Sequence, residues 1–141
     1  MVIFDKDGTL ICFHSMWVPW AKAIAARLST ATGLDLRGEI FYLLGYCPLE
    51  QRVRSGLLAE CTISQIRQAL AQALRRRGVV KAEAIVEREV LDLNQVESTK
   101  TLREIRNTRL LFEDLRRSGI KVAICTADSR SAGIFSFVEG L

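Results

Sequence analysis

The chain is poor in the residues that mark linkers, disulfide scaffolds and membrane spans. Its 141 residues include only two prolines, and no Gly/Ser/Pro-rich stretch divides it, so about one domain's worth of globular chain is expected. Its four cysteines include no C-x-x-C pair, which argues against a zinc site and predicts a reduced, cytoplasmic protein. The apolar stretch at residues 10–26 is interrupted by His14, Pro19 and Lys22, so no membrane span is predicted.

The excess of positive charge is small and has a local explanation. Twenty Lys and Arg residues against 16 Asp and Glu residues give a net charge of +4. Arginines at 75–77 and 116–117 fall in the predicted last turns of two helices, where cations interact favourably with the helix dipole. No aromatic interleaving or reading motif accompanies these charges, so no nucleic-acid partner is predicted. A mild positive field suits an anionic phosphate ester instead.

Two carboxylates directly follow an apolar run at the N-terminus. Residues 2–4 read Val-Ile-Phe, and Asp5 and Asp7 then lead into Gly8 and a threonine. The run predicts a buried strand of a parallel sheet, and ligands bind beyond the carboxyl ends of such strands. Paired carboxylates can act as nucleophile and general acid/base, or can hold Mg²⁺. A turn at Gly8 lets both approach one centre, although an ordinary Asp-Gly turn is the alternative interpretation.

A second apolar run, at residues 122–125, ends in the hydroxyl residue Thr126. It follows a predicted helix and a glycine, and it predicts a second buried strand. Residues 2–10 resemble the first motif of the haloacid dehalogenase (HAD) superfamily, written hhhDxDGT(L/V), and residues 122–126 resemble the second motif of that superfamily.

This resemblance implies a role for each motif residue. Asp5 would be the nucleophile that becomes an aspartyl phosphate, and Asp7 would be the general acid/base. The Asp5 carboxylate and the Asp7 backbone carbonyl would hold Mg²⁺ as the cofactor. Thr126, with Gly8 and Thr9, would bind the phosphoryl group. Since dehalogenases lack the second aspartate, the resemblance is to the phosphatases and phosphomutases of the superfamily.

Between the two motifs the sequence predicts amphipathic helices joined by short links. Ser15 is a candidate N-cap for the first helix, and Thr62 with Gln65 forms a capping box for a later one. Thr101 with Glu104 forms a second capping box before the second strand. The predicted helices span residues 15–33, 36–44, 62–78, 81–93 and 101–119, the second strand spans 121–126, and a further helix starts within 129–139.

The insertion between the two strands is much longer than a parallel crossover needs, which is roughly a dozen or more residues. In the resembled family an insertion here is a helical C1 cap that closes over the active site and selects substrate. We therefore predict an α/β fold. An incomplete HAD-like Rossmannoid parallel core, residues 1–14 and 99–141, would be split by a helical C1-type cap at residues 15–98.

Five residues in or beside the predicted cap have two interpretations each. Trp17 and Trp20 would pack the cap interior with His14 as a surface or capping residue; alternatively, His14 and one tryptophan would line the cleft between cap and core. Arg52 and Arg54 would lie on a solvated face or, alternatively, would meet a substrate carboxylate.

The resemblance implies a Mg²⁺-dependent, phosphoglycolate-phosphatase-like enzyme that hydrolyses a small phosphorylated metabolite. The third motif of the family, a Lys, and its fourth, one or two Asp residues, have no counterpart after Thr126, where only Asp128 and Glu139 are acidic. The chain thus looks C-terminally incomplete, and it is expected to be catalytically weak or inactive and poorly stable. The alternative is a catalytically inactive, truncated HAD remnant or a binding-only domain, while a phosphomutase would use the same residues. Neither the exact substrate nor the oligomeric state is predicted.

Overall fold

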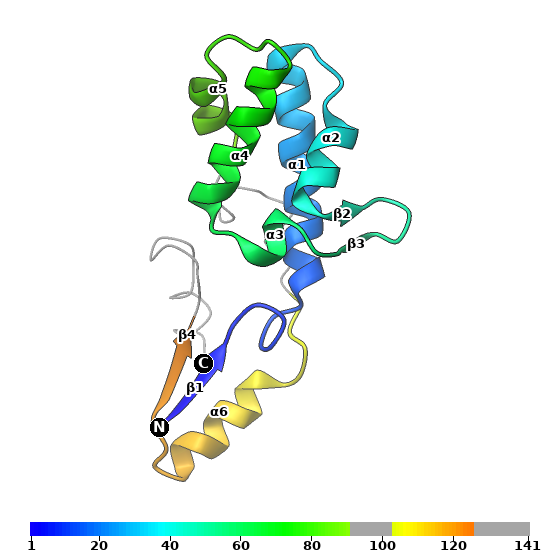
Figure 1. Ribbon diagram of the computed structural model, residues 1–141. Helices are drawn as coiled ribbons and strands as arrows, with labels where there is room; N and C mark the ends of the chain where they lie inside the picture. The colour runs from blue at the N-terminus through cyan, green and yellow to red at the C-terminus, as the bar shows by residue number, and fades with distance from the viewer. Residues whose placement is uncertain (91–102, 126–141) are drawn as a thin grey trace.

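Two short strands from opposite ends of the chain pair in parallel in the computed structural model, which describes residues 1–90 and 103–125. Strand β1 (Val2–Asp5) lies beside β4 (Val122–Cys125), in a register that runs from Val2 opposite Val122 to Asp5 opposite Cys125 (Figure 1). The predicted parallel pairing is confirmed. Thr126 lies outside the described residues. Both described strands therefore end at the same edge of the sheet, which is the edge that carries Asp5.

Helix α6 (Thr108–Arg117) covers one face of this small sheet. The ring centroids of Phe4 and Phe112 are 5.5 Å apart. A buried cluster is formed by Leu10, Ile11 and Phe112, and partly buried side chains pack against it: Phe4, Leu115 and Ile124. Ile3, which alternates with Phe4 along β1, is 60% exposed. The side chains of β1 thus follow the two-residue period of a strand with one covered face.

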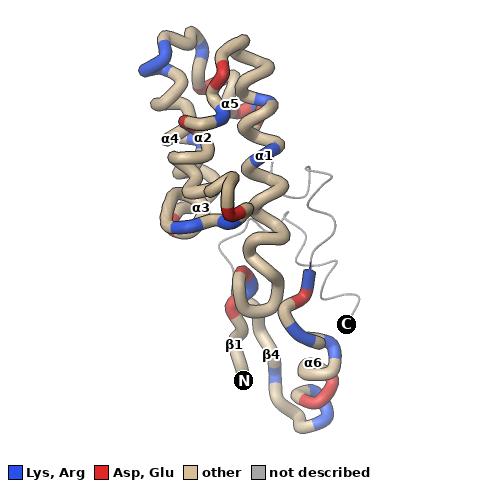
Figure 2. Tube along the Cα trace, turned by 90° about the vertical axis from the view of Figure 1, so that its right-hand side faces the viewer, with Lys and Arg blue, Asp and Glu red and all other residues tan. Residues whose placement is uncertain are grey.

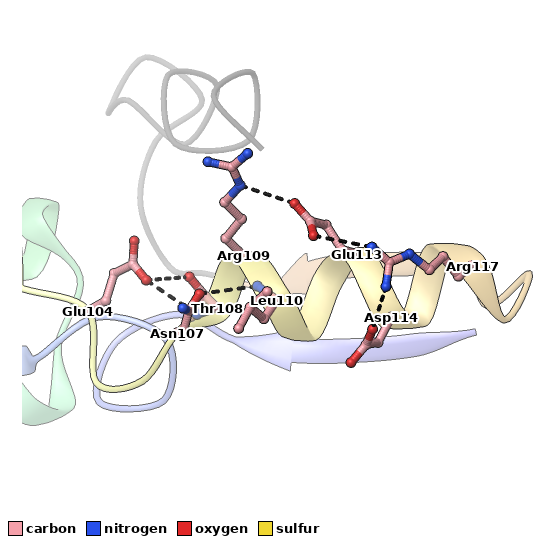
Figure 3. Close-up of polar contacts among 8 residues, drawn as sticks. All are labelled: Glu104, Asn107, Thr108, Arg109, Leu110, Glu113, Asp114 and Arg117. Atoms are coloured by element: carbon pink, nitrogen blue, oxygen red, sulfur yellow. Dashed lines mark hydrogen bonds and ion pairs between the residues drawn. The ribbon is translucent and has the colours of Figure 1, made fainter.

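Helix α6 begins later than the sequence predicts. Residues 103–107 are not helical, and Asn107 is the N-cap, its Oδ1 accepting a hydrogen bond from the Leu110 N–H at 3.2 Å. Glu104 does not cap a helix at residue 101; its carboxylate accepts from the Thr108 hydroxyl at 2.8 Å (Figure 3). The predicted partner of that capping box, Thr101, lies outside the described residues.

Helix α6 starts late because the backbone groups of Arg103 and Ile105 form hydrogen bonds with the N-terminal segment. The carbonyl of Arg103 accepts from the Cys12 N–H at 2.8 Å, and the N–H of Ile105 donates to the Leu10 carbonyl at 3.1 Å. A helix that began at residue 101 would need these groups for its own ladder. The hydrogen bonds to the N-terminal segment form instead of that ladder, and the helix begins only after them.

The segment between β1 and α6 is mainly a helical bundle, drawn at the other end of the molecule in Figure 1. Helix α1 runs through it and packs against α2, α5 and a short strand. Trp20, Ile24 and Leu28 of α1 are fully buried, at the spacing that places them on one helix face. The bundle helices are α1 (Phe13–Thr32), α2 (Arg37–Leu44), α3 (Leu57–Glu60), α4 (Ile63–Arg76) and α5 (Ala82–Glu89).

The helix boundaries follow local signals in some places and not in others. The capping box at the start of α4 is confirmed: the Thr62 side chain accepts from the Gln65 N–H at 3.3 Å, and the Gln65 side chain accepts from the Thr62 N–H at 2.8 Å. Helix α1 ends at Gly33 as predicted, but it begins at Phe13. Ser15 lies inside the first turn, where its hydroxyl donates to the Cys12 carbonyl at 2.7 Å. Ser15 is therefore not the N-cap.

The insertion is not all-helical, contrary to the prediction. Strands β2 (Tyr46–Cys47) and β3 (Arg52–Val53) form an antiparallel hairpin after α2. Each strand has two residues, too few to show a period in the sequence. The predicted limits of core and cap stay a prediction, because residues 91–102 lie outside the described part of the chain.

The basic clusters lie where the sequence predicts them, in the last turns of helices (Figure 2). Arg75 pairs with Glu83 of α5, and Arg77, just after α4, lies 3.2 Å from a carboxylate oxygen of Glu39. Local ion pairs and helix-end placement thus account for these charges. Among residues 1–90 and 103–125, no helix combines the length and the apolar character that crossing a membrane requires.

Candidate active site

The segment after β1 folds back onto the backbone carbonyl of Lys6. That oxygen lies 3.0 Å from the N–H nitrogen of Leu10 and 3.1 Å from that of Ile11, both of which donate to it. Gly8 turns the chain with φ of 86°, in the left-handed region that glycine enters without a steric penalty, and its N–H donates to the Ile11 carbonyl at 2.9 Å. The turn predicted at Gly8 therefore exists.

The Asp5 carboxylate stands at the carboxyl end of β1 and is exposed. Its Oδ2 accepts a hydrogen bond from the Thr9 hydroxyl at 3.0 Å. The turn at Gly8 makes this contact possible, because it brings a residue four positions later back beside the strand end. Thr9 thus orients the carboxylate that the first motif provides.

Asp7 has a cationic neighbour that the sequence analysis did not single out. The Lys6 ammonium lies 3.1 Å from Asp7 Oδ1, and the two side chains are 8% and 21% exposed. Burial of an ammonium is costly unless an opposite charge compensates it, so the pair explains how Lys6 tolerates a buried position. If β1 continued through residue 7, the side chains of Lys6 and Asp7 would point to opposite faces of the sheet. The turn ends that alternation and lets the two side chains meet.

A cleft of about 390 Å³ joins the motif loop to the helical bundle. Asp5 and Asp7 line one side, and Phe13 and Trp17 of α1 line another. The segment from α3 to the first residue of α4 forms the far wall. Its volume falls in the range of roughly 300–1,000 Å³ that small-molecule sites occupy. The remaining lining residues are Leu58, Ala59, Glu60, Cys61, Thr62 and Ile63.

Trp20, Trp17 and His14 have three different environments in the structure, so neither predicted interpretation holds for all of them. Trp20 is fully buried in the bundle, and Trp17, whose ring centroid is 5.4 Å away, is 5% exposed and lines the cleft. His14 does not line the cleft; its Nδ1 accepts from the Val53 N–H at 3.2 Å and so ties the hairpin to α1. Burial, assisted by the charge of Arg52, lowers the pKa of His14 and favours the neutral ring that can accept this bond.

Arg52 and Arg54 lie on the exposed face of the hairpin, and neither lines the cleft. Arg54 pairs with the Glu50 carboxylate, which lowers the pKa of Glu50. The solvated-face interpretation is therefore confirmed for both arginines.

The chain leaves and re-enters the sheet region at one junction. Besides the backbone bond between Cys12 and Arg103, the Arg103 N–H donates to Ser15 Oγ at 3.4 Å, and its guanidinium lies 3.7 Å from Cys12 Sγ. The Ser15 backbone N–H lowers the pKa of the Cys12 thiol, and the Arg103 contact acts in the same direction. The junction thus positions the first turn of α1, and with it Phe13 and Trp17, next to the motif loop.

The donor set of the loop is compatible with a hard divalent cation. Mg²⁺ commonly uses one or two carboxylates and completes its shell with water and substrate phosphate oxygens. The exposed Asp5 carboxylate and the cleft-lining Asp7 fit that pattern. Within residues 1–90 and 103–125, no group of three His, Cys, Asp or Glu side chains is placed to share a metal ion. Thr126, Asp128 and Glu139 lie outside the described residues.

Comparison with known proteins places these motifs in a family. Searches against curated proteins and against solved structures found no significant match. The family model of the haloacid dehalogenase-like hydrolases matches residues 1–134, which is nearly the whole chain. The match includes both motif segments and the helical insertion between them. The chain belongs to the haloacid dehalogenase-like hydrolase family.

Proposed function

We propose that this protein is a phosphatase that hydrolyses the phosphate monoester of a small metabolite through an aspartyl phosphate on Asp5. The observation that carries the proposal is the shared cleft. Asp5 and Asp7 open into the same cavity of about 390 Å³, and the helical insertion supplies its far wall. A nucleophile, an acid/base and a substrate-sized space therefore occur together.

The first half-reaction is transfer of the phosphoryl group to Asp5. A carboxylate oxygen of Asp5 forms a bond to phosphorus while the bond from phosphorus to the ester oxygen breaks. Asp7, in its protonated form, gives its proton to the departing alkoxide. The Thr9 hydroxyl, which donates to Asp5 Oδ2 at 3.0 Å, holds the nucleophile in position.

The second half-reaction restores Asp5. Asp7, now a carboxylate, takes a proton from a water molecule, whose oxygen forms a bond to phosphorus while the bond from phosphorus to the Asp5 oxygen breaks, which frees the Asp5 carboxylate and inorganic phosphate. The Lys6 ammonium, 3.1 Å from Asp7 Oδ1, fixes the orientation of the acid/base between the two steps.

Mg²⁺, held by the Asp5 carboxylate and the Asp7 backbone carbonyl, supplies charge neutralisation at the phosphoryl group when it is bound. Gly8, Thr9 and Thr126 are proposed as phosphate-binding residues on the strength of their motif positions. The insertion is proposed to act as a C1-type cap at residues 15–98 over a core of residues 1–14 and 99–141. In that placement the protein is phosphoglycolate-phosphatase-like, which describes the position of the cap and not the substrate.

The test is a phosphatase screen of the purified chain over a panel of phosphorylated metabolites, in the presence of Mg²⁺ and of EDTA. Hydrolysis that requires Mg²⁺ and disappears in the Asp5→Asn variant is the expected result. Retention of full activity by that variant would show the aspartyl-phosphate mechanism to be wrong. Saturable binding of esters without any turnover would instead favour a binding-only protein.

A further inference from the structure

We propose that the cleft selects phosphate monoesters of amino alcohols, with Glu60 as the residue that recognises the ammonium group. This inference rests on the proposed phosphatase function and deepens it. It follows from the charges, the aromatic surfaces and the hydrogen-bonding capacity of the described cleft walls.

Every charged side chain among the described residues that line the cleft is acidic. Asp5 and Asp7 lie at the motif loop, where the phosphoryl group reacts, and Glu60, the last residue of α3, lies on the far wall. Glu60 is exposed, and none of the described lysines or arginines forms an ion pair with it. An acidic leaving group placed against this wall meets a like charge, whereas an ammonium meets an opposite one.

The aromatic wall supports the same choice. Phe13 and Trp17 both line the cleft, and their ring centroids are 6.0 Å apart. The indole nitrogen of Trp17 is buried, so it is not offered to the cleft as a hydrogen-bond donor. Aromatic faces attract cations through the ring quadrupole. A compact ammonium between these rings and Glu60 is therefore favoured on two sides.

The far wall offers little to a sugar. Beside Glu60, the described residues of this wall present apolar side chains, the Cys61 thiol and one hydroxyl, that of Thr62. This hydroxyl is already used in the capping box of α4, where it accepts from the Gln65 N–H and lies 3.1 Å from Gln65 Oε1. The several hydroxyls of a sugar phosphate would lose water without gaining matching partners. One cationic group, by contrast, needs only the carboxylate of Glu60.

Three esters of nearly equal size separate the possible leaving groups. Phosphoethanolamine carries an ammonium, ethyl phosphate carries no further charge, and 2-phosphoglycolate carries a carboxylate. We expect kcat/KM to fall in that order for the unmodified chain with Mg²⁺. In Glu60→Gln, the preference for phosphoethanolamine over ethyl phosphate should shrink by about fivefold, the upper range for a solvent-exposed ion pair.

The matched control is Glu87→Gln, which alters an exposed carboxylate of α5 outside the cleft and should leave all ratios unchanged. Circular dichroism melts of both variants check that folding is intact. A preference for 2-phosphoglycolate, or an unchanged ratio in Glu60→Gln, overturns the proposal.

Calorimetric binding of the same three esters to Asp5→Asn gives a readout that does not need turnover. Absence of hydrolysis with every ester, p-nitrophenyl phosphate included, would contradict the proposed phosphatase function but would leave the recognition of the ammonium group open to the binding test. Tightest binding of phosphoethanolamine, lost in the Asp5→Asn/Glu60→Gln double variant, still supports the recognition of an ammonium by Glu60. Equal binding of the three esters overturns it.

Discussion

The Lys6 ammonium and the Asp7 carboxylate, neighbours in the sequence, form an ion pair at 3.1 Å beside the cleft. Residue 6 is the variable position of the first motif, so the pair is a property of this chain rather than of the motif. Its burial makes it consequential, because loss of one partner removes a close opposite charge from a partly buried group.

Replacing Lys6 by methionine should reduce both stability and turnover. We expect the free energy of unfolding to fall by about 1.5–3 kcal/mol, the usual contribution of a hydrogen bond to a charged group. We expect kcat to fall by about 10²-fold, near the lower end of what acid–base groups contribute, because Asp7 loses its orientation. Urea unfolding and steady-state kinetics measure the two effects. Lys6→Arg, which keeps the charge, should recover part of kcat; equal kinetics for Lys6→Met and the unmodified chain would contradict the assigned role.

The two motif carboxylates should respond differently to amide substitution. Asp5→Asn should abolish turnover, because an amide is a poor nucleophile, whereas Asp7→Asn should slow it by about 10²–10⁴-fold. Single-turnover kinetics with rapid acid quenching measure both the phosphoenzyme and the product. Asp114→Asn, at an exposed position on α6, is the control and should behave as the unmodified chain. A phosphoenzyme in Asp5→Asn would identify a different nucleophile.

Two glycines that flank the hairpin should be intolerant of alanine. A Cβ on Gly56 would lie 2.6 Å from the Gly45 Cα, and a Cβ on Gly45 would lie 2.6 Å from the Ser55 carbonyl oxygen, both against backbone that has little room to move. We expect Gly56→Ala to lower the free energy of unfolding by about 1–3 kcal/mol.

Gly38 provides the comparison for that substitution. It lies in α2, and a Cβ there meets nothing within 4 Å. Gly38→Ala should therefore stabilise the protein by up to about 1 kcal/mol. Urea unfolding of both variants measures the difference. Equal stability of the two would mean that the hairpin base is less closely packed than the structure describes.

The stability of the protein should fall below neutral pH because of His14. Burial lowers the pKa of this imidazole below its ordinary value of 6.5, so the unfolded state takes up the proton first as the pH falls. The contribution of the neutral ring is complete above pH 6.5 and is lost as the pH decreases toward the lowered pKa. His14 is the only histidine in the chain, so His14→Gln should flatten the pH dependence of urea unfolding below pH 6.5. An unchanged slope in that variant would assign the effect to carboxylates instead.

Local rules predicted the parts of the fold that depend on local interactions. The α4 capping box needs only Thr62 and Gln65, and it formed as the sequence indicates. The similar pattern at 101–104 did not start a helix, since Arg103 and Ile105 bond to the N-terminal segment, and such long-range competition leaves no trace in a short window of sequence. The pairing of β1 with β4 was predictable because two apolar runs with motif residues at their ends have few other arrangements.

The sequence predicted the motif residues of the candidate site, but it did not predict the residues around them that shape the cleft. Asp5 and Asp7 follow from the strand and the turn at Gly8. Lys6 and Glu60 do not, because their roles depend on how the turn closes and on which edge of the bundle faces the loop. A search for charged residues flanking the start of each capped helix would have brought Glu60 forward, two positions before Thr62.

The backbone hydrogen bond between Cys12 and Arg103 brings the start and the end of the insertion together in space. Such an excursion can be lengthened, shortened or exchanged for another without shifting the register of β1 against β4. A lineage built on this plan can acquire a new substrate range by exchanging the module at that point, while the chemistry proposed for Asp5 is inherited unchanged.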